Sequence, residues 1–261
     1  MFNLKDRHAI VCGSTQGMGR ACAFEMARLG AQVTLVARNQ NALEAVLRDL
    51  PSDAACNHDF ICQDFADPDA LREKIVAHLR DAGPAHILLN NTGGPPAGPV
   101  SEARADDFIA AFKQHVLCNQ VLAQAVLPGM KQAGYGRIIN IISTSVKTPI
   151  PGLGVSNTIR GAVASWAKTL AGEVARFGIT VNNILPGYIE TQRLHDVFAA
   201  RAAQTGQMAD EVGALFLAQV PAGRFGAVEE VSRVVAFLAS PAASYVNGIN
   251  LPVDGGRTPT L

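Results

Sequence analysis

A glycine-rich segment near the N-terminus, residues 12–19, constrains the fold more than any other feature of the chain. It follows a short apolar run and opens a helical pattern. Gly13 permits a tight turn there, Gly17 lets the backbone approach a pyrophosphate, and Gly19 lets the helix pack on the strand. The helix N-terminus adds free N–H groups and the positive end of its dipole. This context, rather than the glycines alone, predicts a dinucleotide-binding loop. The residues of that loop are Gly13, Ser14, Thr15, Gln16, Gly17, Met18 and Gly19.

Short apolar runs alternate with helical patterns along the chain. Strands are expected over residues 8–12, 32–37, 57–62, 86–89, 137–142, 179–185 and 249–253. Helices are expected over residues 17–29, 41–50, 68–81, 105–132, 155–177 and 228–239, and residues 191–219 have a helical pattern without clear ends. Repeated βα units with apolar strands predict an α/β fold, a three-layer, doubly wound parallel sheet of about seven strands with helices on both faces. Since no linker divides the chain, we expect one Rossmann-type domain over residues 1–261.

Charge and cysteine usage narrow the range of partners and compartments. The 22 basic and 22 acidic residues give no electrostatic reason to expect nucleic acid or an anionic membrane surface. The sequence has no signal-peptide pattern and no uninterrupted apolar run of about 18 residues. The cysteines are dispersed, which predicts thiols in a reducing compartment rather than a metal site or disulfides. They are Cys12, Cys22, Cys56, Cys62 and Cys118. We therefore expect a soluble, cytoplasmic protein.

The end of the second expected strand indicates which dinucleotide the chain binds. An acidic residue there would bind a ribose 2′-hydroxyl and favour NAD(H), but this chain has Ala37-Arg38. An arginine can form charge-assisted hydrogen bonds to a 2′-phosphate. The sequence therefore favours NADP(H), with NAD(H) as the alternative in which Arg38 is an ordinary surface residue.

Further motifs resemble those of the short-chain dehydrogenase/reductase family, in the family's order and over essentially the whole chain. They are Asp64 near the expected adenine site, Asn90-Asn91-Thr92-Gly93, the strand from Gly136 to Ser143, Pro186-Gly187 with Thr191, and Asp254-Gly255-Gly256. The resemblance implies a nicotinamide-dependent oxidoreductase that assembles as a tetramer or dimer, and we expect a homotetramer. It also implies that the cofactor is bound by Asp64, Phe65, Asn91, Thr92, Gly93, Arg160, Pro186, Gly187, Ile189 and Thr191, together with Arg38 and the glycine loop.

The chain departs from the family at the catalytic residues. Members of the family use a tyrosine as proton donor and a lysine four residues later, but no tyrosine of this chain is followed by lysine at that spacing. Alignment of the motifs places Ser156 at the tyrosine position and Arg160 at the lysine position. The relay asparagine falls on His115, or on Asn119 if the helix register slips. Residues 91–96, 146–147 and 156–160 resemble a divergent subgroup often described as similar to β-ketoacyl-carrier-protein reductases.

The altered residues change what the site can do. Ser143 can still donate a hydrogen bond to a carbonyl, and Arg160 can hold ribose hydroxyls but cannot give up a proton near neutral pH. Ser156 is a poor acid, because an aliphatic hydroxyl has a pKa far above the operating pH. Lys147, four residues beyond Ser143, is the candidate proton donor, and His115 is the alternative.

Two classes of function follow. In the first, the protein is an NADP(H)-dependent oxidoreductase that reduces a carbonyl of the 3-oxoacyl or ketone type, or oxidises a secondary alcohol. In the second, it is a dinucleotide-binding sensor or scaffold without redox turnover. Retention of Ser143 and of a cation at position 160 favours the first class. A substrate lid is expected over residues 189–220, with an apolar content that fits a small, partly apolar molecule. Tyr188, which follows Pro186-Gly187, is expected to pack within that lid, with a position facing the substrate as the alternative.

Overall fold

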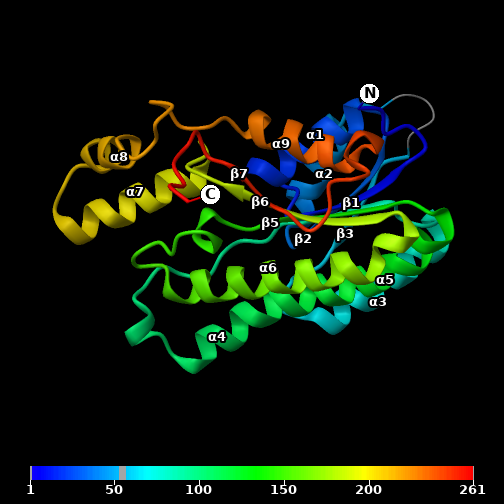
Figure 1. Ribbon diagram of the computed structural model, residues 1–261, viewed down its shortest axis with the longest axis horizontal. Helices are drawn as coiled ribbons and strands as arrows, with labels where there is room; N and C mark the ends of the chain where they lie inside the picture. The colour runs from blue at the N-terminus through cyan, green and yellow to red at the C-terminus, as the bar shows by residue number, and fades with distance from the viewer. Residues whose placement is uncertain (1, 53–56, 261) are drawn as a thin grey trace.

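A parallel sheet of seven strands organises the part of the chain that the computed structural model describes, residues 2–52 and 57–260. Its strand order is β3-β2-β1-β4-β5-β6-β7, so the chain winds outward in both directions from β1 (Figure 1). The strands are β1 (His8–Cys12), β2 (Gln32–Ala37), β3 (Asp59–Cys62), β4 (Ile87–Asn90), β5 (Gly136–Ile141), β6 (Ile179–Pro186) and β7 (Asn250–Val253). The predicted fold class is confirmed. Cys56 lies outside the described residues.

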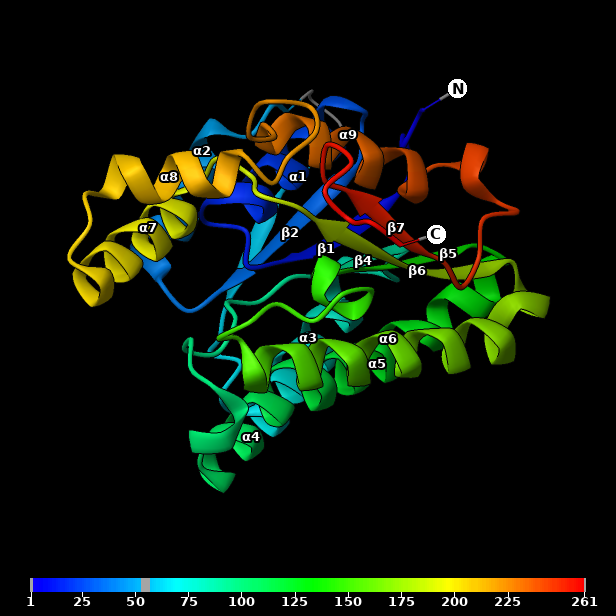
Figure 2. The same cartoon turned by 60° about the vertical axis from the view of Figure 1, so that its left-hand side comes forward.

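Helices cover both faces of the sheet. They are α1 (Gly17–Arg28), α2 (Gln40–Asp49), α3 (Pro68–Ala82), α4 (Ala105–Phe112), α5 (Cys118–Ala133), α6 (Gly154–Val174), α7 (Gln192–Thr205), α8 (Ala209–Leu217) and α9 (Val228–Ala239). Helices α1, α2 and α9 pack on one face, and α3, α5 and α6 pack on the other (Figures 1 and 2). Helices α7 and α8 extend beyond the end of the sheet (Figure 1). Strands β1, β4, β5 and β6 are buried along their whole length, so their sequences are mostly apolar, and the polar residues they contain are buried with them.

Two predicted helical segments differ from the structure. Residues 105–132 were expected as one helix, but a π-helical turn, Lys113–Leu117, separates α4 from α5. The turn buries His115 to 2% exposure and leaves Phe112 exposed. Residues 191–219 form two helices, because Gly206 has a left-handed φ of 71° that ends α7. The backbone N–H of Met208 then bonds the Glu211 carboxylate at the start of α8.

Four asparagines form a ladder across the buried part of the sheet. They are Asn90, Asn140, Asn183 and Asn250, which are direct neighbours on β4, β5, β6 and β7. Each of the first three donates its side-chain amide to the carbonyl oxygen of the next, at 2.8 Å in all three bonds. The ladder satisfies polar groups that would otherwise be costly to bury. Within the ladder, the Oδ1 atom of Asn90 is buried without a hydrogen-bond partner among the described residues.

Candidate active site

The loop between β1 and α1 has the shape that a dinucleotide requires. Gly13 adopts a φ of 61°, and a Cβ on Gly19 would overlap the Gly13 carbonyl, so both positions need glycine. Gln16 precedes α1 without any side-chain cap, which leaves the first N–H groups of the helix available to phosphate. A Cβ on Gly17 would lie 3.5 Å from the Thr191 methyl, so the loop after β6 faces the glycine loop across a narrow gap. The residues of the loop therefore fit a bound pyrophosphate.

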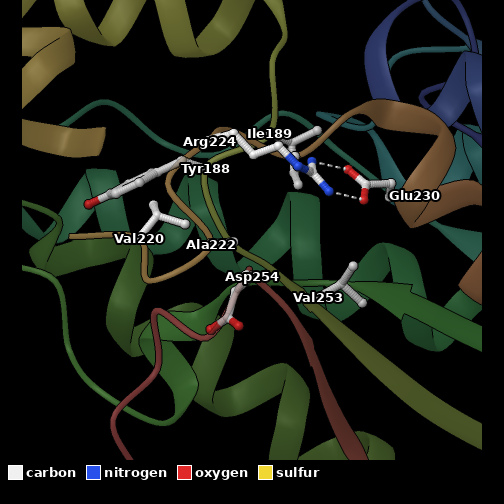
Figure 3. A pocket seen from close by; sticks show the side chains of 10 residues that line it. Tyr188, Ile189, Val220, Ala222, Arg224, Glu230, Val253 and Asp254 are labelled. Atoms are coloured by element: carbon white, nitrogen blue, oxygen red, sulfur yellow. Dashed lines mark hydrogen bonds and ion pairs between the residues drawn. The ribbon is translucent and has the colours of Figure 1, made fainter. Parts of the chain in front are cut away.

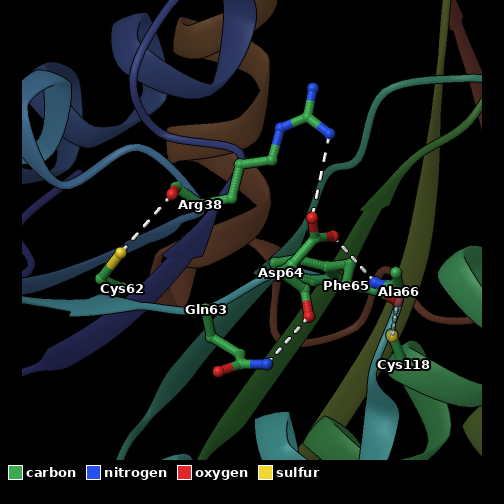
Figure 4. A network of polar contacts seen from close by, with 7 residues as sticks. All are labelled: Arg38, Cys62, Gln63, Asp64, Phe65, Ala66 and Cys118. Atoms are coloured by element: carbon green, nitrogen blue, oxygen red, sulfur yellow. Dashed lines mark hydrogen bonds and ion pairs between the residues drawn. The ribbon is translucent and has the colours of Figure 1, made fainter.

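Two residues predicted to bind the adenosine end of the cofactor contact each other. Arg38 follows β2, Asp64 follows β3, and their side chains are 3.9 Å apart (Figure 4). Both are exposed, so this ion pair adds little stability by itself. The Arg38 guanidinium thus lies beside the ends of β2 and β3 (Figure 4). Phe65 packs its ring into the core and presents its backbone carbonyl, which accepts from the Cys118 thiol at 3.1 Å.

The loop after β4 connects the glycine loop to the central helix. The Asn91 amide approaches the carbonyl oxygens of Cys12 and Gly13 at 3.4 and 3.3 Å. The next residue, Thr92, lies 2.7 Å from Nδ1 of His115 through its hydroxyl. A Cβ on Gly93 would meet nothing within 4 Å, so this loop has an open side where a ligand can lie.

The loop after β6 forms the opposite wall of the site. Pro186 ends the strand, and Gly187 donates to the Val253 carbonyl at 2.9 Å. Ile189 is buried and pairs with Gly226. Thr191 caps α7 by accepting from the Leu194 N–H, which fixes the start of the lid.

Ser143 and Arg160 lie at the carboxyl end of β5, where ligands bind in doubly wound sheets. The Ser143 hydroxyl accepts from the Ser145 N–H at 3.0 Å, which leaves its own proton able to be donated. Arg160 is 8% exposed and donates to the Ile141 carbonyl at 2.9 Å. Burial and the nearby Arg193 lower the pKa of Arg160 to about 10, so it stays charged at neutral pH. Ser156 lies one helical turn before Arg160 on the buried face of α6.

His115 is held as a neutral imidazole. Burial is the main cause that lowers its pKa to about 3, and the charges of Arg160 and Arg193 lower it further. Its Nε2 atom is buried with no hydrogen-bond partner among the described residues. Of the two residues considered for the relay position, His115 therefore contacts the loop after β4, whereas Asn119 is buried one turn further along the helix.

Lys147 and Tyr188 are the remaining candidate residues from the sequence. Lys147 follows the short helical turn Thr144–Val146 that begins after Ser143, and it is half-buried. Tyr188 packs in an aromatic cluster with Phe216 and Phe225 beneath the lid, and its hydroxyl bonds Gln219 at 3.1 Å. It thus packs as predicted.

A pocket beneath the lid lies apart from the reacting groups (Figure 3). Its walls include Tyr188, Val220 and Asp254, while Ser143, Ser156 and Arg160 do not line it. The charged residues at its rim, Arg224 and Glu230, form two hydrogen bonds of 2.7 Å to each other. The pocket therefore belongs to the lid and its connection to β7, not to the predicted catalytic centre.

Two arginines near the site were not predicted from the sequence. Arg193, the second residue of α7, lies beside Gly94 in the loop after β4. Arg257 stacks over the Tyr188 ring at 4.2 Å and donates to the Thr144 hydroxyl at 3.2 Å. For Arg193, its position two residues after Thr191 at the start of the expected lid was the one signal in the sequence that could have placed it near the site, and for Arg257 the sequence offered none.

The fold and these groups define a dinucleotide-dependent oxidoreductase, with a phosphate-binding loop, a cation after β2 and carbonyl-directed donors after β5. A family model described as enoyl-(acyl carrier protein) reductase matches residues 13–258. The chain belongs to the short-chain dehydrogenase/reductase family. None of the helices in the described ranges is long and apolar enough to span a membrane.

Similar proteins share the whole length of the chain. Gluconate 5-dehydrogenase of Gluconobacter oxydans is 33% identical over 100% of this chain and 98% of its own. The 3-oxoacyl-[acyl-carrier-protein] reductase FabG of Haemophilus influenzae is 32% identical over 97% of this chain and 98% of its own. The structure of L-sorbose reductase from Gluconobacter frateurii, complexed with NADPH and L-sorbose, has a TM-score of 0.93 and 29% identity, and the match covers 100% of this chain and 99% of that one.

Proposed function

We propose that this protein uses NADP(H) to reduce a carbonyl of the 3-oxoacyl or ketone type, or to oxidise the corresponding secondary alcohol. The observation that carries the proposal is the buried Arg160 cation, which bonds the Ile141 carbonyl at the end of β5 two residues before Ser143, beside the loop that Asn91 ties to Gly13. Both carbonyl types occur in the names of relatives, as a 3-oxoacyl thioester and as the ketose sorbose.

The nicotinamide ring would supply or accept the hydride, and the chain's residues hold it in place. The glycine loop and the N-terminus of α1 fit the pyrophosphate. Arg38 fits a 2′-phosphate at the end of β2, where no acidic side chain competes for a ribose hydroxyl in the described residues of that turn. We therefore assign NADP(H), with NAD(H) as the weaker alternative.

The chain's residues divide the remaining chemistry among them. Ser143 orients the carbonyl through its free hydroxyl proton, and the charged Arg160 guanidinium, which has several donors, would hold ribose hydroxyls of the cofactor. Ser156 does not serve as the acid, and neutral His115 holds no proton that it can release near pH 7. Lys147, one turn beyond Ser143, is assigned as the proton donor.

The second candidate function is dinucleotide binding without turnover, and the tyrosines favour it. The Tyr135 hydroxyl bonds the Ala239 carbonyl, Tyr188 packs under the lid, and Tyr245 is fully exposed. Hence no tyrosine in the described ranges takes the place of the family's usual acid. A sensor or scaffold would keep the cofactor loops and lose the acid.

One experiment separates the two functions. NADPH oxidation is measured against a panel of ketones and 3-oxoacyl thioesters, beside a direct titration of NADPH binding. Turnover with a defined carbonyl supports the oxidoreductase. Tight NADPH binding without turnover across the panel contradicts it and supports the sensor or scaffold.

We also propose a homotetramer in the cytoplasm. Ile109, Phe112 and Leu117 leave an exposed apolar stripe along α4 and the π-helical turn, which a second subunit would cover. Cys12 and Cys22 are buried as free thiols, as suits a reducing compartment.

A further inference from the structure

Two arginines from different parts of the chain converge on Gly94. A Cβ placed on Gly94 would lie 2.7 Å from Nη2 of Arg193 and 3.5 Å from Nη2 of Arg160. The two guanidinium groups are therefore within about 6 Å of each other, with Arg160 buried and Arg193 at the exposed mouth of the site. Glycine at position 94 leaves the space that Arg193 occupies.

This pair has no counter-ion from the protein. Within the described residues, Arg160 forms its hydrogen bond to a backbone carbonyl, and neither Arg160 nor Arg193 forms an ion pair. A buried cation without a paired anion is costly unless a ligand supplies the negative charge. The site is thus built for an anion that arrives with a ligand.

His115 supplies a third group at the same place. It lies close enough to both arginines for their charges to lower its pKa. Its Nε2 atom is buried and meets no hydrogen-bond distance and angle among the described residues, Nδ1 lies 2.7 Å from the Thr92 hydroxyl, and the Gly93 backbone lies near enough to raise the pKa of the ring against the effect of burial. When the Thr92 hydroxyl donates to Nδ1, the single proton of the neutral ring lies on Nε2, which makes it a donor for an anionic oxygen.

We propose that Arg193 and Arg160 form a clamp for a carboxylate on the substrate, so that the ketone or alcohol this protein acts on is an oxo acid or hydroxy acid. A carboxylate presents two oxygens that can accept from both guanidinium groups at once. The proposal deepens the proposed function and rests on it. It also discriminates among substrates named for relatives, because gluconate carries a carboxylate and sorbose does not.

The pyrophosphate of the cofactor is the other anion that could bind between the two arginines. The experiment distinguishes it from a substrate carboxylate. Isothermal titration calorimetry measures the affinity of the NADP⁺-bound protein for lactate, tartrate and gluconate. Each affinity is compared with that for a neutral polyol of the same carbon number. We expect at least one carboxylate to bind about tenfold to a hundredfold more tightly than its neutral partner. Arg193→Met should abolish that preference and leave the affinity for NADP⁺ unchanged.

Two further variants sharpen the test. Gly94→Ala keeps both arginines but displaces the Arg193 guanidinium, so it should weaken carboxylate binding as well. Arg201→Met, which removes an exposed arginine from the same helix, should change nothing. The clamp is refuted if no carboxylate is preferred, or if Arg193→Met weakens NADP⁺ binding while the preference persists. Because the titration needs no turnover, an inactive enzyme would refute the proposed function without deciding the clamp.

Discussion

Replacing His115 with asparagine should flatten the dependence of stability on pH. In the folded protein the pKa of His115 is lowered from 6.5 to about 3, mainly by burial. As pH falls below 6.5, the unfolded chain binds a proton at this position and the folded chain does not. The contribution of His115 to the free energy of unfolding is therefore fully present above pH 6.5 and is lost as the pH falls toward 3.

The pKa difference sets the size of the effect. The whole difference corresponds to about 5 kcal/mol of unfolding free energy, and about 2 kcal/mol of it is lost between pH 7.5 and pH 5. Since asparagine does not titrate, His115→Asn should lose about 2 kcal/mol less than the wild type over the same range. His8, whose pKa is lowered to about 4, contributes equally to both proteins and cancels in the comparison.

Urea denaturation followed by circular dichroism, at pH 7.5 and pH 5, measures this difference. His195→Asn changes an exposed histidine and serves as the control that should follow the wild type. Equal losses of stability for the wild type and His115→Asn would show that His115 is not held neutral. Our argument that it cannot donate a proton near pH 7 would then fail as well.

Four further results are expected. Arg38→Ala should weaken NADPH binding by about 1–3 kcal/mol and leave NADH binding nearly unchanged, and equal wild-type affinity for both cofactors would contradict this. Lys147→Met should lower the chemical step by about 10²–10⁴-fold at constant NADPH affinity. If Lys147→Met keeps full activity and His115→Ala loses it, the proton donor lies on the central helix and not at Lys147. Asn140→Leu should cost about 2–5 kcal/mol in urea denaturation, because it leaves the Asn90 amide and the Asn183 carbonyl without partners; a loss below 1 kcal/mol would argue against the ladder. Light scattering at micromolar concentration should give a tetramer, and a monomer would refute the proposed assembly.

The sequence predicted the fold well because its signals are local. Apolar runs marked the buried strands, and glycines with φ values such as that of Gly13 marked the turn into the first helix. The helix over residues 228–239 was predicted to the residue. By contrast, the π-helical turn at 113–117 has no marker in composition, because it adds one residue to a turn whose neighbours remain helical.

The site could be predicted only in part, for a physical reason. Ser143, Ser156 and Arg160 could be located by their spacing from motifs on the same elements. The contact of Arg193 with Gly94 joins residues almost one hundred positions apart, and it depends on how the lid helix packs over the loop after β4. The protonation state of His115 depends likewise on its burial and on the charges of Arg160 and Arg193. Neither can be read from the residues that neighbour His115 in the sequence.

The asparagine ladder has a consequence for biosynthesis. Its last acceptor is Asn250, on the strand that is synthesised last, and every earlier amide donates toward it. A ribosome-bound chain that has not yet released β7 must keep the Asn183 amide either hydrated or unpaired. The inner strands therefore reach their final stability only when β7 has paired with β6. A prematurely terminated chain would carry a polar defect in its core that quality-control proteases can recognise through local opening.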